Sequence, residues 1–268
     1  MRVYVPSMGR AGNIGSVVTT ASAIKSAVYV VPFEEKERYE RALKDRGNYE
    51  VVSCAEKGIA AVRRWIGEYA ASKKEHSFCM IDDDLMFAVR KSLDGWQLRP
   101  CTGSDIQSML SWIQTAIESF GYAHASVSPR MVNAAQFKEG CNANTGIQEN
   151  KRTLRMLAYK TKRFLEMKHG RVPVMEDFDV NLQLLEAGHK NVLSYYWAND
   201  QRGTGSVGGC SSYRTLEAHT AAAQKLHELH PEFVTLREKE NKTGHASLRK
   251  RMEVTIQWQK AYESSQRS

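Results

Sequence analysis

Three consecutive aspartates follow a short apolar run in the first third of this 268-residue chain. The run Phe78–Ile81 is typical of a strand buried on both faces, and such a strand does not normally end in three like charges. Carboxylates this close raise one another's pKa unless a cation or several hydrogen-bond donors lie among them. Because side chains alternate along a strand, Asp82 and Asp84 are expected on the same side, where two carboxylates suit a hard divalent ion.

A second acidic pair opens a predicted helix later in the chain. Glu176 and Asp177 precede apolar residues at helical spacing, such as Phe178 and Leu182, and Gly188 is the expected end of the helix. The helix dipole favours carboxylates in a first turn, which is one sufficient reason for the pair. The other interpretation is chemical, because a carboxylate held there beside a metal stays ionised and accepts a proton from a hydroxyl group.

Predicted strands and helices alternate up to the aspartates, and this setting favours a ligand site over a solvated acidic turn. The strands cover Val3–Val5, Ala27–Val31, Tyr49–Cys54 and Phe78–Ile81, and the helices cover Ile14–Ile24, Phe33–Asp45 and Ile59–Ala71. The alternation predicts an α/β fold with a mostly parallel central sheet and right-handed crossovers. Such sheets bind their ligands at the carboxyl ends of the strands, which is where the aspartates lie.

The remainder of the chain carries weaker signals. We expect a hairpin of Phe87–Lys91 with Trp96–Arg99, a helix Ile106–Phe120 capped at Ser104 and Asp105, strands at Ala123–Val127 and Asn191–Trp197, and a helix Leu216–Leu229. The pattern of Leu154–Leu165 fits either a strand or a helix. Residues 199–214 contain four glycines among small hydroxyl residues and are either a loop that closes over a ligand or a flexible linker.

The turn after the first strand is a candidate nucleotide contact. Residues 6–13 contain two glycines, a serine and Arg10, at the place where α/β proteins present backbone N–H groups to a nucleotide. The turn has neither a dinucleotide-binding glycine pattern nor a P-loop lysine. We therefore expect a looser contact, in which Arg10 pairs with a phosphate or a base or else lies on the surface. Lys57 and Arg64, at the start of the third helix, are expected to reach the same site.

Composition indicates a soluble protein of the cytoplasm. The five cysteines lie far apart without zinc-like spacing, and this favours reduced thiols. Neither a signal peptide nor an apolar run long enough to cross a bilayer is present in the sequence.

Much of the net charge of +8 lies in one segment, Lys151–Arg171, called the basic segment below. It and its flank from Glu149 hold eight Lys and Arg against two Glu. Such a patch suits a polyanion, since each neutralised phosphate releases counterions, but a solvated basic face is an equally good interpretation of charge alone.

The two acidic motifs together resemble those of glycosyltransferases of the GT-A fold. The Asp82-Asp83-Asp84 run resembles their Asp-x-Asp motif, and Met175-Glu176-Asp177 resembles their x-Glu-Asp motif. Residues 5–10 and 208–214 more narrowly resemble bacteriophage glycosyltransferases that act on hypermodified DNA bases. The resemblance implies a GT-A-like (Rossmann-like) domain over residues 1–215. A basic helical extension, residues 216–268, is then expected to pack on the same domain at the acceptor side.

The resemblance also implies residue roles. Asp82 would contact the ribose or metal of a nucleotide sugar, and Asp84 would bind Mn²⁺ or Mg²⁺, with His245 as a further ligand and His219 as an alternative. Asp177 would be the general base if the reaction inverts the anomeric centre, with Glu176 as the less favoured candidate. Donor-binding residues are expected to be Pro6, Ser7, Gly9, Arg10, Lys57, Arg64, Asp82 and Asp83. Acceptor-binding residues are expected to be Lys151, Arg152, Arg155, Tyr159, Lys160, Arg163, Arg202 and Arg214, with Phe164 as a second stacking surface.

The resulting hypothesis is a metal-dependent transfer of a sugar, from a donor such as a UDP-sugar, to a hydroxymethylated pyrimidine in double-stranded phage DNA. The reaction would take place in the cytoplasm of an infected bacterial host. Three alternatives stay open at this point. They are the same chemistry on a glycan or protein acceptor, a metal-dependent nucleotidyltransferase, and a catalytically inactive DNA-binding module of the same fold.

Overall fold

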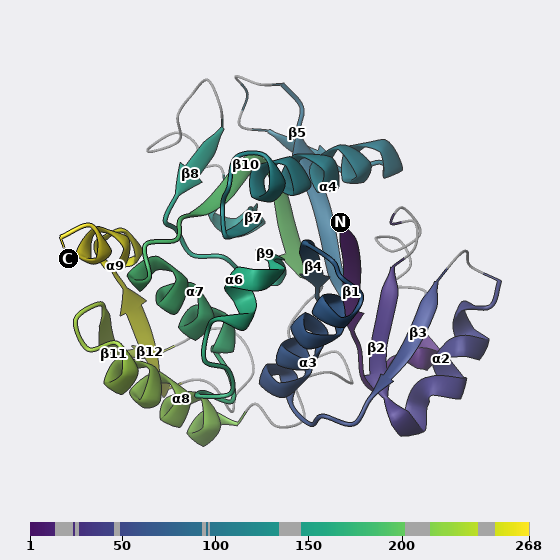
Figure 1. Ribbon diagram of the computed structural model, residues 1–268, viewed down its shortest axis with the longest axis horizontal. Helices are drawn as coiled ribbons and strands as arrows, with labels where there is room; N and C mark the ends of the chain where they lie inside the picture. The colour runs from purple at the N-terminus through teal and green to yellow at the C-terminus, as the bar shows by residue number, and fades with distance from the viewer. Residues whose placement is uncertain are drawn as a thin grey trace.

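The computed structural model describes residues 1–13, 24, 27–45, 49–92, 95, 97–133, 146–201, 215–240 and 250–267, and the structural statements below refer to these residues. They form a mixed sheet flanked by helices, with a small two-stranded sheet beside it (Figure 1). Along the sheet the strands follow the order β3-β2-β1-β4-β9-β7-β10-β5-β6, and β8 pairs with β10.

The first half of the sheet is parallel, as the sequence predicts. Its strands are β1 (Arg2–Pro6), β2 (Val28–Pro32), β3 (Glu50–Cys54) and β4 (Ser77–Ile81). All five residues of β4 are buried, because helices cover both faces of the sheet there. The carboxyl ends of these strands therefore meet at one edge, which is called the site edge below.

The second half of the sheet is mixed. Its strands are β5 (Leu85–Arg90), β6 (Leu98–Pro100), β7 (His124–Pro129), β8 (Ile147–Glu149), β9 (Met156–Lys160) and β10 (Asn191–Gln201). Strand β9 is antiparallel to both of its neighbours, β4 and β7, whereas β7 and β10 are parallel to each other. Strand β5 pairs with β10, so the chain leaves β4 near the middle of the sheet and enters β5 near its far side.

Helices cover the two faces of the sheet with separate apolar clusters. On one face lie α3 (Ile59–Ser72), α6 (Thr161–Leu165) and α7 (Glu176–Glu186), and on the other lie α2 (Lys36–Leu43) and α4 (Gly103–Glu118). Short 3-10 turns, η1 (Ala11–Asn13) and η2 (Phe33–Glu35), follow β1 and β2. Alternation along β1 divides its side chains, because Val3 and Val5 join one cluster and Tyr4 joins the other.

Several local expectations are corrected by the structure. The ambiguous segment 154–165 is both a strand and a helix, since β9 ends where α6 begins. The cap of α4 is Thr102, whose side chain accepts the N–H of Asp105 while the Asp105 carboxylate accepts the N–H of Thr102. Residues 130–133 are helical, directly after β7. The expected helix at 14–24 lies almost entirely outside the described residues.

The sequence predicts a helical C-terminal segment, but the structure shows strands as well as helices there. It contains α8 (Leu216–Leu229), β11 (Val234–Glu240), β12 (Lys250–Ile256) and α9 (Trp258–Ser265), and the two strands pair antiparallel. The segment packs against α7 through an apolar cluster that includes Phe178, Leu185, Leu226 and Ala261. The C-terminal segment therefore lies directly on the helix that begins with the second acidic motif (Figure 1).

Among the described residues, Cys54, Cys79 and Cys101 are free thiols. A search of the same residues finds no helix with the length and apolar character needed to cross a bilayer.

A buried histidine fastens the C-terminal segment to α7. His230 is 2% exposed; Nδ1 lies 2.6 Å from Oε1 of Glu186, and Nε2 lies 2.9 Å from Oδ1 of Asp179. Burial lowers the pKa of His230, but the two carboxylate hydrogen bonds outweigh it, and the net effect is a pKa above the ordinary value of 6.5. Arg171 also pairs with Asp179, so the cluster holds two cations and two carboxylates when His230 is protonated.

We expect His230→Gln to show that this proton stabilises the fold. Because the folded pKa is raised, the contribution is fully present below about pH 6.5 and is lost as pH rises through the folded value. The difference in free energy of unfolding between wild type and variant should therefore be larger at pH 6 than at pH 9. Urea unfolding followed by circular dichroism measures both, and a difference independent of pH would contradict the charge on His230.

Candidate active site

The acidic turn, Asp82–Asp84, lies between β4 and β5 at the site edge. Strand β4 ends at Ile81, so the three aspartates are in a turn, and the strand alternation expected to place Asp82 and Asp84 on one side does not apply. Instead, Asp82 faces Arg63 while Asp83 and Asp84 both face Arg10. Two arginines thus compensate the charge of the turn.

The loop after β1 holds the acidic turn from one side. Ser7 Oγ donates to Asp83 Oδ2 at 2.5 Å, and it lies 2.6 Å from the hydroxyl of Tyr39. Arg10 pairs with Asp83, and its Nη1 lies 3.2 Å from Asp84 Oδ2. Burial raises the pKa of Asp83, whereas Arg10 and Ser7 oppose this rise. The net effect is a pKa raised to about 7. The structure therefore brings together three of the expected donor-binding residues.

The other expected donor residues are less closely engaged. Pro6 ends β1 and is buried, and the N–H of Gly9 donates to Glu35 Oε2 at 2.8 Å. Lys57 is exposed. Arg64 is turned away from the acidic turn, because its side chain is 42% exposed and pairs with Glu56 and Glu68. The expectation that Arg64 reaches the site is therefore wrong.

The residue that reaches the site from α3 is its neighbour, Arg63. Its side chain is only 9% exposed, its Nη2 donates to Asp82 Oδ1 at 2.8 Å, and its Nη1 pairs with Glu176. Arg63 lies in helical register with Ile59, Ile66 and Ala70, the last two fully buried. A single charge within an apolar helical stripe is the signal that sequence reasoning missed.

Glu176 is not a capping residue. The helix α7 starts after Met175, which has a left-handed φ of 66° and makes no side-chain capping bond, and the Glu176 carboxylate turns to Arg63. Burial raises the pKa of Glu176, Arg63 opposes this rise, and the neighbouring carboxylate of Asp177 adds to it. Glu176 therefore anchors the start of α7 to α3 and, through Arg63, to the acidic turn.

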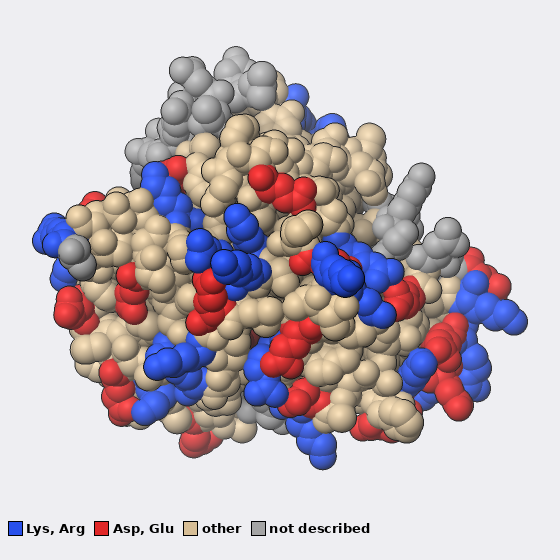
Figure 2. Space-filling model, in the orientation of Figure 1, with Lys and Arg blue, Asp and Glu red and all other residues tan. Residues whose placement is uncertain are grey.

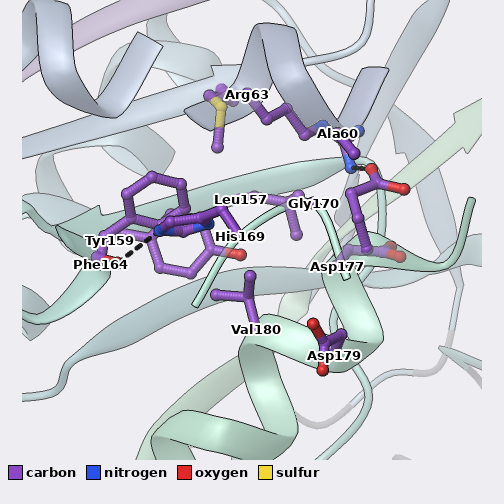
Figure 3. A pocket seen from close by; sticks show the side chains of 12 residues that line it. Ala60, Arg63, Leu157, Tyr159, Phe164, His169, Gly170, Asp177, Asp179 and Val180 are labelled. Atoms are coloured by element: carbon purple, nitrogen blue, oxygen red, sulfur yellow. Dashed lines mark hydrogen bonds and ion pairs between the residues drawn. The ribbon is translucent and has the colours of Figure 1, made fainter. Parts of the chain in front are cut away.

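Asp177 lines a small cavity next to this ion pair. One of its oxygens accepts the N–H of Phe178 at 3.1 Å, and its side chain is partly exposed. The cavity measures about 10 Å³, which is about the room that one water molecule needs, and Figure 3 shows Asp177 at one end and the rings of Tyr159 and Phe164 toward the other. A nucleotide sugar does not fit inside this cavity.

Asp84 has one oxygen available for a ligand. Gln201 Nε2 donates to its Oδ2 at 2.8 Å, whereas its buried Oδ1 has no hydrogen-bond partner among the described groups. Within the described part of the chain no three His, Cys, Asp or Glu residues are grouped as a metal site, and His245 lies outside that part. His219, the alternative ligand, instead has Nδ1 3.1 Å from the Met252 carbonyl. The available oxygen fits Mg²⁺ or Mn²⁺ of the kind that binds through one or two carboxylates and substrate phosphates.

Some residues of the basic segment lie at the site edge, and others lie at the opposite edge of the sheet. Arg152 lies 4.6 Å over the ring of Phe178, and the carbonyl of Arg155 accepts the N–H of Asp82 at 3.1 Å, so both lie at the site edge. Strand β9 then runs to the opposite edge, where Lys160 pairs with Ser77. In the view of Figure 2, basic and acidic side chains are interspersed instead of forming one patch.

Several of the predicted acceptor-binding residues are corrected by the structure. Tyr159 and Phe164 are 1% and 2% exposed and pack on each other, so neither ring offers a face to a nucleic-acid base. Lys160 and Arg163 lie away from the acidic turn, and Arg163 pairs with Glu166. The backbone of Lys151 donates to Asn191, near the start of β10. Arg202 and Arg214 lie outside the described residues.

We expect Arg63→Met to destabilise the fold by about 3 kcal/mol, because it leaves the buried carboxylate of Glu176 and the partly buried carboxylate of Asp82 without their partner. Arg64→Met is the matched control, since it removes the same charge from the same helix where the side chain is exposed, and it should cost less than about 0.5 kcal/mol. Urea unfolding of both variants measures the difference. Equal costs would contradict the bridging role of Arg63.

Comparison with known proteins identifies the family to which the chain belongs. A model of the TET-associated glycosyltransferase family matches residues 1–209. The β-glucosyl-HMC-α-glucosyl-transferase of Enterobacteria phage T6 is 22% identical over 243 residues, which are 87% of this chain and 82% of that protein.

Solved structures of similar fold include a UDP-glucose pyrophosphorylase with UDP-glucose, with 12% identity, 72% of this chain and 89% of that chain covered, and a TM-score of 0.45. Another is a putative glucose-1-phosphate thymidylyltransferase from Bacillus anthracis, with 10% identity, 87% and 96% covered, and a TM-score of 0.43. The family match spans well over half of the chain and confirms the resemblance seen in the acidic motifs. The chain therefore belongs to the TET-associated glycosyltransferase family and is a glycosyltransferase.

Proposed function

We propose that this glycosyltransferase moves a sugar from a nucleotide-sugar donor to a hydroxymethylated pyrimidine in phage DNA. The observation that carries the proposal is the convergence of Asp82 and Glu176, far apart in sequence, on the buried Arg63 at the site edge. The family and the phage T6 relative, whose name gives β-glucosyl-HMC as its acceptor, support an acceptor in modified DNA.

The donor is expected to lie across the ends of β1, β2 and β4. Ser7 and Arg10 come from the end of β1, and Phe33 follows β2 with an exposure of 76%. Adjacent strands are about 4.8 Å apart, so the end of β2 lies about 10 Å from that of β4. A nucleoside diphosphate covers such a span, with its base against Phe33 and its phosphates at the acidic turn. The donor would be a UDP-sugar.

Asp84 would hold a Mn²⁺ or Mg²⁺ ion that arrives with the donor, whereas Asp82 is engaged by Arg63. When bound, the ion would supply positive charge that stabilises the leaving diphosphate. The chain itself contributes Arg10, which already lies beside Asp84, and Gln201, which fixes one oxygen of Asp84 and leaves the other available. His245, the further ligand that the resemblance implies, lies outside the described residues.

Asp177 is the better candidate for accepting the proton of the acceptor hydroxyl. Glu176 is 8% exposed and is engaged by Arg63, whereas Asp177 is less buried and borders the open site edge. Both lie in the first turn of α7, at the positive end of the helix dipole. This role applies to a reaction that inverts the anomeric centre. The anomeric configuration of the product distinguishes inversion from retention.

Arg152 and Arg155 are the basic residues best placed for an acceptor phosphate. The Phe178 ring orients the guanidinium of Arg152 through a cation–π contact next to Asp177. Arg155 has a left-handed φ of 66° and follows the same edge of the sheet beside Asp82. A DNA backbone held by these two side chains would pass directly over the acidic turn.

The test is nucleoside mass spectrometry of DNA incubated with the protein, Mn²⁺ and a panel of nucleotide sugars. Three DNAs are needed, containing hydroxymethylcytosine, hydroxymethyluracil or β-glucosyl-HMC. A hexose or pentose increment on one base establishes donor and acceptor together. Donor hydrolysis without an increment on any DNA would contradict the DNA acceptor and favour a glycan or protein acceptor.

We expect Asp84→Asn to reduce transfer by about 100-fold or more, because several kcal/mol of charge stabilisation at the leaving group are lost. Removing divalent ions with EDTA should have the same effect on wild type, and Mn²⁺ or Mg²⁺ should restore it. Glu40→Gln, which neutralises a 51% exposed carboxylate on α2, is the control and should leave the rate unchanged. Full activity of the Asn variant would exclude Asp84 as a metal ligand.

We expect the double variant Arg152→Gln/Arg155→Gln to raise KM for DNA about tenfold and to reduce the slope of log affinity against log salt by about two. Lys160→Gln/Lys162→Gln is the matched control at the opposite edge, with the same charge change and little expected effect. Salt titrations of DNA binding measure both. Equal effects of the two pairs would place the DNA elsewhere.

A further inference from the structure

Exposed large apolar side chains are concentrated at the site edge. Of the six such residues in the described part of the chain, four follow the carboxyl ends of strands: Met8 after β1, Phe33 after β2, and Met131 and Val132 after β7. Single exposed apolar residues are ordinary, but Met131 is 91% exposed and has Val132, 38% exposed, beside it. This pair lies on the β7 side of the acidic turn, away from Phe33.

A buried polar network fixes the turn that displays Met131. Asn133 is fully buried, and its amide donates to the Ser128 hydroxyl and, at 3.0 Å, to the carbonyl of Tyr195. Arg90, 1% exposed, binds the Asn133 side chain and donates to the same Tyr195 carbonyl at 2.8 Å. Burying an arginine is costly unless its hydrogen bonds are satisfied, and this network fixes the chain at Asn133, two residues after Met131.

The turn is connected to the acidic turn through β10. Pro129 pairs with Asn199, two residues before Gln201, whose amide holds Asp84. Two residues of a strand span about 7 Å. Beside Met131, Arg130 is 44% exposed, and its Nε is 4.0 Å from Asp200, so its guanidinium is only loosely held. An apolar side chain and a cation thus project together next to the proposed reaction site.

We propose that Met131, with Val132, is a wedge that enters the base stack of duplex DNA when the acceptor base is drawn out toward the acidic turn. This inference rests on the proposed DNA acceptor. A base inside a duplex has to leave the stack to reach carboxylates held in a protein surface, and lost stacking and pairing oppose this step. An unbranched apolar side chain that fills the gap offsets part of this cost, and Arg130 binds a neighbouring phosphate.

The test compares one modified base in three DNAs: fully paired, opposite an abasic site, and single-stranded. With Met131→Ala, kcat/KM should fall about tenfold on paired DNA and less than twofold on the other two, where little or no pairing opposes extrusion. Met131→Leu, which keeps the apolar volume, should behave like wild type. Phe120→Ala, which removes a 70% exposed ring at the opposite edge, should have no effect on any DNA.

The outcomes separate this inference from the proposed function. Equal losses for Met131→Ala on all three DNAs, or no loss on paired DNA, would overturn the wedge while leaving the DNA acceptor intact. If wild type transfers sugar to none of the three, the proposed acceptor fails and the wedge fails with it. Fluorescence of 2-aminopurine next to the modified base gives a second readout, since Met131→Ala should weaken the unstacking signal on binding.

Discussion

The ion pairs of Arg63 with Asp82 and Glu176 are the interaction on which the site depends. The three groups come from α3, from the end of β4 and from the start of α7, and none of them is stable when buried alone. Their mutual neutralisation fixes two acidic motifs, nearly a hundred residues apart in sequence, at one edge of the sheet. Without the guanidinium, each carboxylate would favour water or protonation, and the edge would open.

The ion pairs at the site edge also determine which carboxylate oxygen of the acidic turn is left without a partner. Arg63 and Arg10 contact three of the six carboxylate oxygens of the acidic turn, Ser7 donates to a fourth, and Gln201 shares Asp84 Oδ2 with Arg10, whereas Asp84 Oδ1 has no partner among the described groups. In the proposed function, this oxygen would bind a cation weakly by itself and more strongly together with the phosphates of the donor. This agrees with a donor that brings its own negative charge.

Helix α7 is held at both ends, which matters because Asp177 lies on it. Its N-terminus is tied to α3 through Glu176, and its body is tied to the C-terminal segment through Asp179, Glu186 and His230. The apolar cluster around Phe178 and Leu185 packs the same segment against it. A proposed proton acceptor positioned in this way moves little, so its distance to a bound hydroxyl is determined by the fold as a whole.

The sequence alone determined the parallel half of the sheet and the two acidic motifs, because buried parallel strands produce continuous apolar runs and unusual like charges stand out at their ends. It predicted neither the antiparallel β9 nor the hairpin of β11 and β12, since pairing partners depend on contacts distant in sequence. Only the tertiary structure distinguished Arg63 from Arg64, which are neighbours of similar chemistry separated by about 100° around one helix. It also divided the basic segment between two opposite edges, because charge counts along a chain carry no information about which way a strand runs.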